Sequence, residues 1–192
     1  MIGQLPSTLT VGGSSYKIRT DFRTILYILE AFEDPDLNDI AKQRILYEIL
    51  YYDYDKIPNE YYEEAIAEAV RFIDGGRTTT KKKDTPSPAV MSWTQDEALI
   101  FSSVNKVAGK EVREVDRMHW WTFMGYYQEC DEGIFKFIVS IRQKFYNGKP
   151  LEKHEKEFLK NNPEMVLIQH KMSEEEKKEK EEIDAMFDAL FY

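Results

Sequence analysis

The amino-acid sequence predicts a mainly α protein: a bundle of about six or seven helices with a short N-terminal β-hairpin and a charged C-terminal helical arm. Three observations predict this fold. Apolar residues recur at helical spacing through most of the chain. Glycines and prolines separate these stretches, and only one passage near the N-terminus looks like strands. The chain has 192 residues, 42% of them hydrophobic, which suffices for one folded core.

The N-terminal passage predicts the hairpin. Residues 9–11 and 14–18 flank Gly12 and Gly13, and two glycines can supply the positive φ angles that a tight turn requires. Two strands alone are marginally stable in water. We therefore expect the hairpin to cover one end of the helical core or to join the sheet of another chain.

Three helices are predicted in the first half of the chain. The first follows Asp21, a good N-cap residue, and ends before Pro35. The second covers about residues 38–52. The third begins after Pro58 and ends at two glycines, and its early glutamates suit the positive end of the helix dipole.

Residues 75–92 predict a mobile basic loop inside the helical domain. The passage from Arg77 to Lys83 carries four basic residues, and the next five residues contain two prolines, so there is almost nothing to bury. We interpret this segment as a solvated loop held open by its own charge. Contact with an acidic surface or a nucleic acid is the alternative.

The second half predicts four more helices. Ser92 and Gln95 have the spacing of a capping box, which indicates that a helix opens there and continues to about residue 107. The following helices are expected at residues 116–129, 131–146 and, more briefly, 151–159. We expect residues 1–162 to form a single domain.

The sixth predicted helix, residues 131–146, is apolar on more than one side, which predicts a place in the middle of the bundle. Arg142 projects into its apolar arc. A buried guanidinium is costly unless it is paired. We therefore favour a structural ion pair for Arg142, with an anion-binding site as the alternative.

Residues 163–192 predict an acidic arm. From residue 171 onward it has four basic and eight acidic residues, a net charge of 4 − 8 = −4. Its last turns carry an apolar stripe, which is typical of a segment that docks in the groove of a partner. Folding back onto its own bundle is the equal alternative. The stripe consists of Ile183, Met186, Phe187, Leu190 and Phe191.

The densest aromatic cluster is residues 119–123. Trp120 and Trp121 are adjacent, so on a helix they lie about 100° apart and cannot both point into one core. We place Trp120 inward with Phe123. Trp121 then either faces outward as a protein-binding residue or is wedged against a second element.

Composition and motifs count against several function classes. The net charge is −9, from 26 basic and 35 acidic residues, which disfavours nucleic acid as the main partner. A single cysteine, Cys130, excludes an internal disulfide framework and a multi-thiolate metal site. No apolar stretch suits a membrane span, and no secretory signal opens the chain, so we expect a cytoplasmic protein.

Residue patterns give no support for catalysis. On one helix His119 and Cys130 would lie about 16 Å apart, too far for a nucleophile and its base. Asp53 and Asp55 lack the surroundings of a calcium loop, and we interpret them as a turn. We expect no enzyme activity, no cofactor and no bound metal.

Several passages together resemble a family of small proteins from tailed phages and prophages of Gram-positive bacteria. The resemblance covers roughly residues 5–162. These passages are Thr20-Asp21-Phe22-Arg23, Trp93-Thr94-Gln95-Asp96, His119-Trp120-Trp121-Thr122-Phe123, Ile141-Arg142-Gln143-Lys144 and Asn147-Gly148-Lys149.

The resemblance implies a role in the assembly of phage tails. Genes of this family typically lie just ahead of the tape-measure gene, in the place of tail assembly chaperones. Such chaperones are thought to coat the tape-measure protein, recruit tail tube subunits and leave before the tail is complete. The implied partners are the tape-measure protein and the tail tube protein, and the resemblance supplies no catalytic residues.

We therefore expect a non-enzymatic protein-binding factor in the cytoplasm of the bacterial host. The first alternative is a structural minor tail or connector protein that is retained in the virion. The second is an enzyme or an inhibitor of a host protein. The open edges of the hairpin and the apolar end of the arm are compatible with a homo-oligomer.

Overall fold

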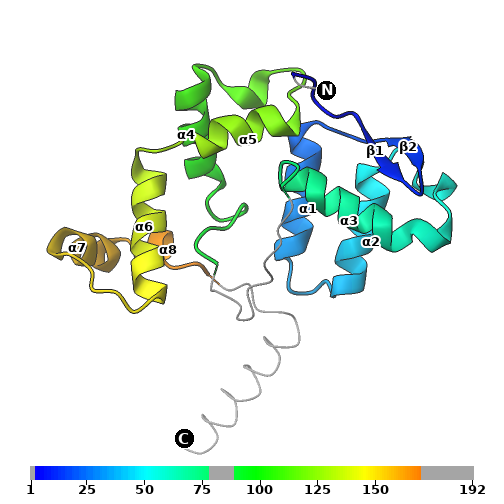
Figure 1. Ribbon diagram of the computed structural model, residues 1–192. Helices are drawn as coiled ribbons and strands as arrows, with labels where there is room; N and C mark the ends of the chain where they lie inside the picture. The colour runs from blue at the N-terminus through cyan, green and yellow to red at the C-terminus, as the bar shows by residue number, and fades with distance from the viewer. Residues whose placement is uncertain (1–2, 78–88, 170–192) are drawn as a thin grey trace, which may run out of the picture.

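The computed structural model describes residues 3–77 and 89–169 (Figure 1). These residues contain eight α-helices and one two-stranded antiparallel sheet, so the mainly α prediction is confirmed. Helices α4 and α5 lie between the hairpin with α1–α3 on one side and α6–α8 on the other. The elements are β1 (Thr8–Val11), β2 (Ser14–Lys17), α1 (Phe22–Glu33), α2 (Asp39–Leu50), α3 (Tyr62–Ile73), α4 (Glu97–Ala108), α5 (Trp120–Gln128), α6 (Ile134–Tyr146), α7 (Lys153–Asn161) and α8 (Pro163–Val166).

The first elements form where the sequence predicts them. In the hairpin, Leu9 and Val11 are buried, and β1 packs against α3. At Gly12, φ is +54°, and an added Cβ would lie 2.6 Å from the Tyr61 ring. Glycine is therefore required there both by conformation and by space. The Asp21 side chain caps α1 by accepting a hydrogen bond from the Arg23 N–H.

Helix α4 begins at Glu97, five residues later than predicted. The Ser92 Oγ does accept a hydrogen bond from the Gln95 N–H at 3.0 Å, as a capping box predicts. The Asp96 carboxylate, however, accepts from the Ser92 N–H at 3.0 Å. Residues 92–96 therefore close a separate turn before the helix starts.

Helix α5 begins at Trp120 rather than near residue 116, because His119 is its N-cap. The Nδ1 atom of His119 accepts a hydrogen bond from the Trp121 N–H at 3.0 Å. The stretch before it is extended and joins residues far away in the sequence. The Trp120 N–H donates to the Thr20 carbonyl at 2.7 Å, and the Phe22 N–H donates to the Met118 carbonyl at 3.0 Å.

The core is centred on aromatic rings from α1, α4 and α5. The Phe22 and Phe123 rings are parallel with centroids 4.7 Å apart, and the Phe101 ring lies 6.1 Å from that of Phe22. Trp120 stacks on the other side of Phe123, at 5.8 Å. The buried rings fix how these three helices meet.

The prediction that the sixth helix is central is wrong. Helix α6 lies to one side of the molecule, where it packs against α4 and α8, and Phe145 near its end is 48% exposed (Figure 1). The predicted ion pair at Arg142 is confirmed. Its guanidinium makes two hydrogen bonds to the buried Asp96 carboxylate, at 2.6 and 2.8 Å.

The first residues of the predicted arm contact the body of the protein. Arg142 donates to the Val166 carbonyl at 2.6 Å, and the Val166 side chain is buried. The side chain of Gln95 accepts a hydrogen bond from the Gln169 N–H at 2.8 Å. The division at residue 163 stays a prediction, and residues 170–192 lie outside the described part of the chain.

Candidate protein-binding groove

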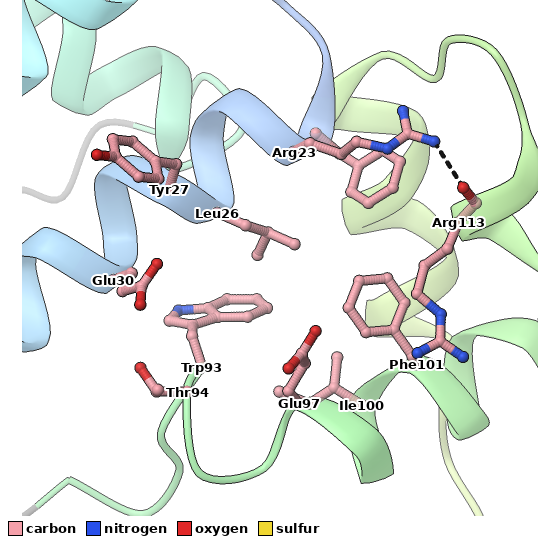
Figure 2. Close-up of a pocket in the computed structure, with 11 residues that line it drawn as sticks. Arg23, Leu26, Tyr27, Glu30, Trp93, Thr94, Glu97, Ile100, Phe101 and Arg113 are labelled. Atoms are coloured by element: carbon pink, nitrogen blue, oxygen red, sulfur yellow. Dashed lines mark hydrogen bonds between the residues drawn. The ribbon is translucent and has the colours of Figure 1, made fainter.

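A groove of about 370 Å³ lies between α1 and α4 (Figure 2). Its floor is the exposed side of the aromatic core, and its rim is charged. The lining residues come from three places that are far apart in the sequence. They are Phe22, Arg23, Leu26, Tyr27, Glu30, Trp93, Thr94, Glu97, Ile100, Phe101 and Arg113.

The apolar floor is supported from behind. The Trp93 ring lies 5.2 Å from that of Tyr127 and 6.1 Å from that of Trp120, so the indole is wedged between the core and the groove. Burial raises the pKa of Tyr127 to about 12. A ring held in this way can receive an apolar side chain with little further loss of conformational freedom.

The turn that carries Trp93 is anchored by one carboxylate of α1. Glu33 accepts hydrogen bonds from the Trp93 N–H at 2.6 Å and from the Thr94 N–H at 3.2 Å. It also accepts from the hydroxyls of Ser92 and Thr94, at 2.8 and 2.9 Å. Together with the Asp96–Arg142 pair, these bonds hold the wall of the groove in place.

The basic end of the groove is already neutralised. Arg23 donates to the carbonyls of Arg113 and Val115, at 3.0 and 2.6 Å, and forms an ion pair with Asp21. Arg113 makes two hydrogen bonds of 2.8 Å to Glu111, and these hold the pKa of that carboxyl down at about 2. Both cations therefore have carboxylate partners.

The acidic groups of the rim have no such partners. Glu30 and Glu97 flank the Trp93 indole in Figure 2. Within residues 3–77 and 89–169, neither carboxylate makes a hydrogen bond or an ion pair, and the same holds for the indole N–H of Trp93. The groove thus presents two acceptors and one donor beside an apolar floor.

Tyr27 stands at the edge of the groove and is 62% exposed. It also lines two neighbouring hollows, one bordered by Arg19 and Glu48 and the other by Leu37 and Ile45. An exposed tyrosine among several hollows is typical of residues that dominate protein interfaces. Tyr27 is the most prominent aromatic side chain of this surface.

The predicted binding residue Trp121 lies elsewhere. Its indole N–H donates to the Phe72 carbonyl at 2.8 Å, and its ring stacks on that of Phe72 at 5.9 Å. It is therefore wedged against the end of α3, close to Gly76, and half-buried. A role in partner binding stays a prediction for Trp121. The other candidates (Ile183, Met186, Phe187, Leu190 and Phe191) lie outside the described residues.

None of the groove residues is among those predicted to bind a partner. One signal could have identified Tyr27, because it lies about 100° away from Leu26 on the first helix and therefore off the apolar stripe. An aromatic residue on the polar side of an amphipathic helix needs an explanation. Trp93 gives no such signal, since its position depends on the turn at residues 92–96.

Other reactive side chains are used structurally. The Cys130 thiol donates to the Tyr126 carbonyl at 3.2 Å, and burial raises its pKa. Asp53 binds Lys56 within a turn, at 2.7 Å. Among the described residues, no cluster of three or more His, Cys, Asp or Glu could hold a metal ion. None of their helices is long and apolar enough to span a membrane.

Comparison with known proteins gives one match. No curated protein and no solved structure matches the chain. The family model described as Bacteriophage Gp15 protein matches residues 1–167, which include every helix of the structure and the whole groove. The resemblance to a phage protein family is thereby confirmed, and the chain belongs to the Bacteriophage Gp15 protein family.

Proposed function

We propose that this phage protein is a non-enzymatic protein-binding factor of tail morphogenesis that acts as a tail assembly chaperone. In this role it holds the tape-measure protein, recruits tail tube subunits, or does both, in the cytoplasm of a Gram-positive host. The observation that carries the proposal is the groove between α1 and α4. It combines an apolar floor with polar groups that have no partner among the described residues.

The groove suits a long helical client better than a small substrate. Its open side lets a chain pass across it, while Trp93 and Tyr27 provide large, rigid aromatic surfaces at low entropic cost. The second candidate is a minor tail or connector protein that is retained in the virion. The same surface would then form a permanent interface.

The proposal is tested by co-expression of the chain with its tape-measure protein. We expect soluble tape-measure protein in complex with the wild-type chain, and about tenfold weaker binding or more for Tyr27→Ala. Tyr52→Ala is the matched control, because Tyr52 is 53% exposed and does not line the groove. Truncation after Met172 measures the contribution of the predicted docking stripe, with the helical content of the body as its control.

Each outcome has a definite consequence. If the tape-measure protein is equally insoluble with and without the chain, the chaperone role is wrong. Mass spectrometry of purified phage particles separates the two candidates, since a chaperone is absent from them and a structural component is present. Equal binding by the Tyr27→Ala and Tyr52→Ala variants would move the site away from the groove.

A further inference from the structure

We infer that the groove between α1 and α4 selects an amphipathic helix of a partner protein, with an apolar anchor flanked by lysine or arginine. This inference rests on the proposed function and specifies the chemistry of the partner segment. Two properties of the groove carry it: the state of its backbone groups and the sign of its free charges.

The backbone around the groove favours a helical partner. Two walls are the helices α1 and α4, whose backbone groups bond within each helix. In the connecting turn, the N–H groups of Trp93 and Thr94 are bound by Glu33. Arg23 occupies the Arg113 carbonyl at the far end. An extended peptide would find no strand edge to pair with, so the bound segment has to satisfy its own backbone, as a helix does.

The charges around the groove favour a basic partner. The guanidinium groups of Arg23 and Arg113 are bound to Asp21 and Glu111, whereas Glu30 and Glu97 make no ion pair among the described residues. A lysine or arginine one turn away from an apolar anchor could reach these carboxylates. The acceptors stand on either side of Trp93, which would contact the anchor (Figure 2).

The same charges disfavour the acidic arm of this chain as the occupant. Its apolar stripe includes Asp184 and Asp188 between the apolar positions. Like charges on the stripe and on the rim of the groove would repel each other. The arm is therefore a separate binding element in this proposal, and its own occupancy of the groove is an outcome that the experiment can detect.

The test uses two fluorescently labelled helical peptides longer than about 15 residues, so that they fold readily. Both carry the same leucine stripe. One has lysines beside the stripe, and the other has glutamates at those positions. Fluorescence anisotropy with the full chain should show about tenfold tighter binding of the lysine peptide, and the difference should shrink as salt is added.

A charge swap identifies the site. The Glu30→Lys/Glu97→Lys variant should reverse the preference, so that the glutamate peptide binds more tightly. The control is Glu63→Lys/Glu157→Lys, which changes the net charge equally at two exposed residues outside the groove. Circular dichroism of each variant verifies that it is folded.

Three results would overturn the inference: equal binding of both peptides by the wild-type chain, the same response in both charge variants, or displacement of the peptide by the acidic arm alone. The co-expression assay keeps this failure separate from that of the proposed function. If Glu30→Lys/Glu97→Lys still holds the tape-measure protein, the basic-helix inference fails while the chaperone function stands.

Discussion

The two sides of the molecule are held together by different forces. The hairpin and α1–α5 enclose a core of apolar side chains, with the stacked Phe22 and Phe123 rings at its centre. On the other side, α6 and α8 share a few buried apolar residues around one charged group, Arg142. The comparison shows that a small helical unit can be attached by directed polar bonds where its apolar area is too small.

The short helix α8 illustrates why Arg142 is suited to this place. The last carbonyl groups of a helix have no partner within it. Arg142 donates to two of them, those of Met165 and Val166, while it also binds the Asp96 carboxylate. The planar guanidinium has enough donors to serve all of these acceptors at once. A single side chain thus joins α6, α8 and the turn before α4.

The largest effect on this comparison is expected from Arg142→Met. The substitution leaves the buried Asp96 without its counter-charge and strips two carbonyls of α8 of their donor. We expect the free energy of unfolding to fall by about 3–5 kcal/mol. Hydrogen exchange should increase first in α6–α8 and later in α1–α3.

The double variant Arg142→Met/Asp96→Leu provides the control. It removes both buried charges together, so it should lose clearly less stability than Arg142→Met alone. If the two variants are equally unstable, the carbonyl bonds rather than the ion pair hold α8, and the contrast between the two sides would need to be redrawn.

The next effect concerns apolar packing and uses two isoleucines that are both fully buried, Ile25 in α1 and Ile141 in α6. We expect Ile25→Ala to lower the free energy of unfolding by about 2–5 kcal/mol, because its neighbours on all sides are fixed. Ile141→Ala should cost less, since α6 packs mainly against α4 and α8 and can shift. Chemical denaturation measures both. A loss for Ile141→Ala equal to that for Ile25→Ala would contradict the distinction.

The smallest effect concerns pH and belongs to the first side alone. His119 accepts from the Trp121 N–H through Nδ1, so its Nε2–H must be the donor to the Pro6 carbonyl, at 2.9 Å. Both bonds require the neutral ring. Burial, the largest cause, lowers the pKa of His119 below the 6.5 of an unfolded chain.

The sign of the pH effect follows from that direction. Above about pH 6.5 the ring is neutral in both states, and its contribution is complete. As the pH falls below this value, the unfolded chain takes up a proton that the folded chain excludes, so stability declines. His119→Asn keeps a capping oxygen and removes this titration. Its stability relative to wild type should rise between about pH 7 and about pH 5, and a constant difference would contradict the assignment.

Local signals in the sequence predict much of this fold, and long-range contacts explain what they miss. The N-cap at Asp21 and the two-glycine turn depend on neighbouring residues, and both form as predicted. The start of α4 depends instead on Glu33 and Arg142, which reach residues 92–96 from distant parts of the chain. The apolar sides of α6 suggested a central helix because periodicity does not show how many neighbours a helix has.

The groove was harder to predict than the fold for the same reason. Its floor looks like ordinary core in the sequence, since Phe22 and Leu26 belong to the apolar stripe of α1. Their exposure on one side depends on where the turn at Trp93 is held. The arm, by contrast, shows its stripe directly in the sequence, which is why it was the first candidate for binding.

The extended segment before α1 has a consequence for how the chain is made. Asp21 bonds to the Met118 N–H across 97 residues, and the Pro6 carbonyl bonds to His119 across 113. A ribosome that adds about 5–20 residues per second needs about 5–20 s to supply those partners. During that time the amino-terminal segment has no permanent neighbour, and the floor of the groove is not closed from below. The earliest-made residues of this protein are therefore among the last to reach their final places.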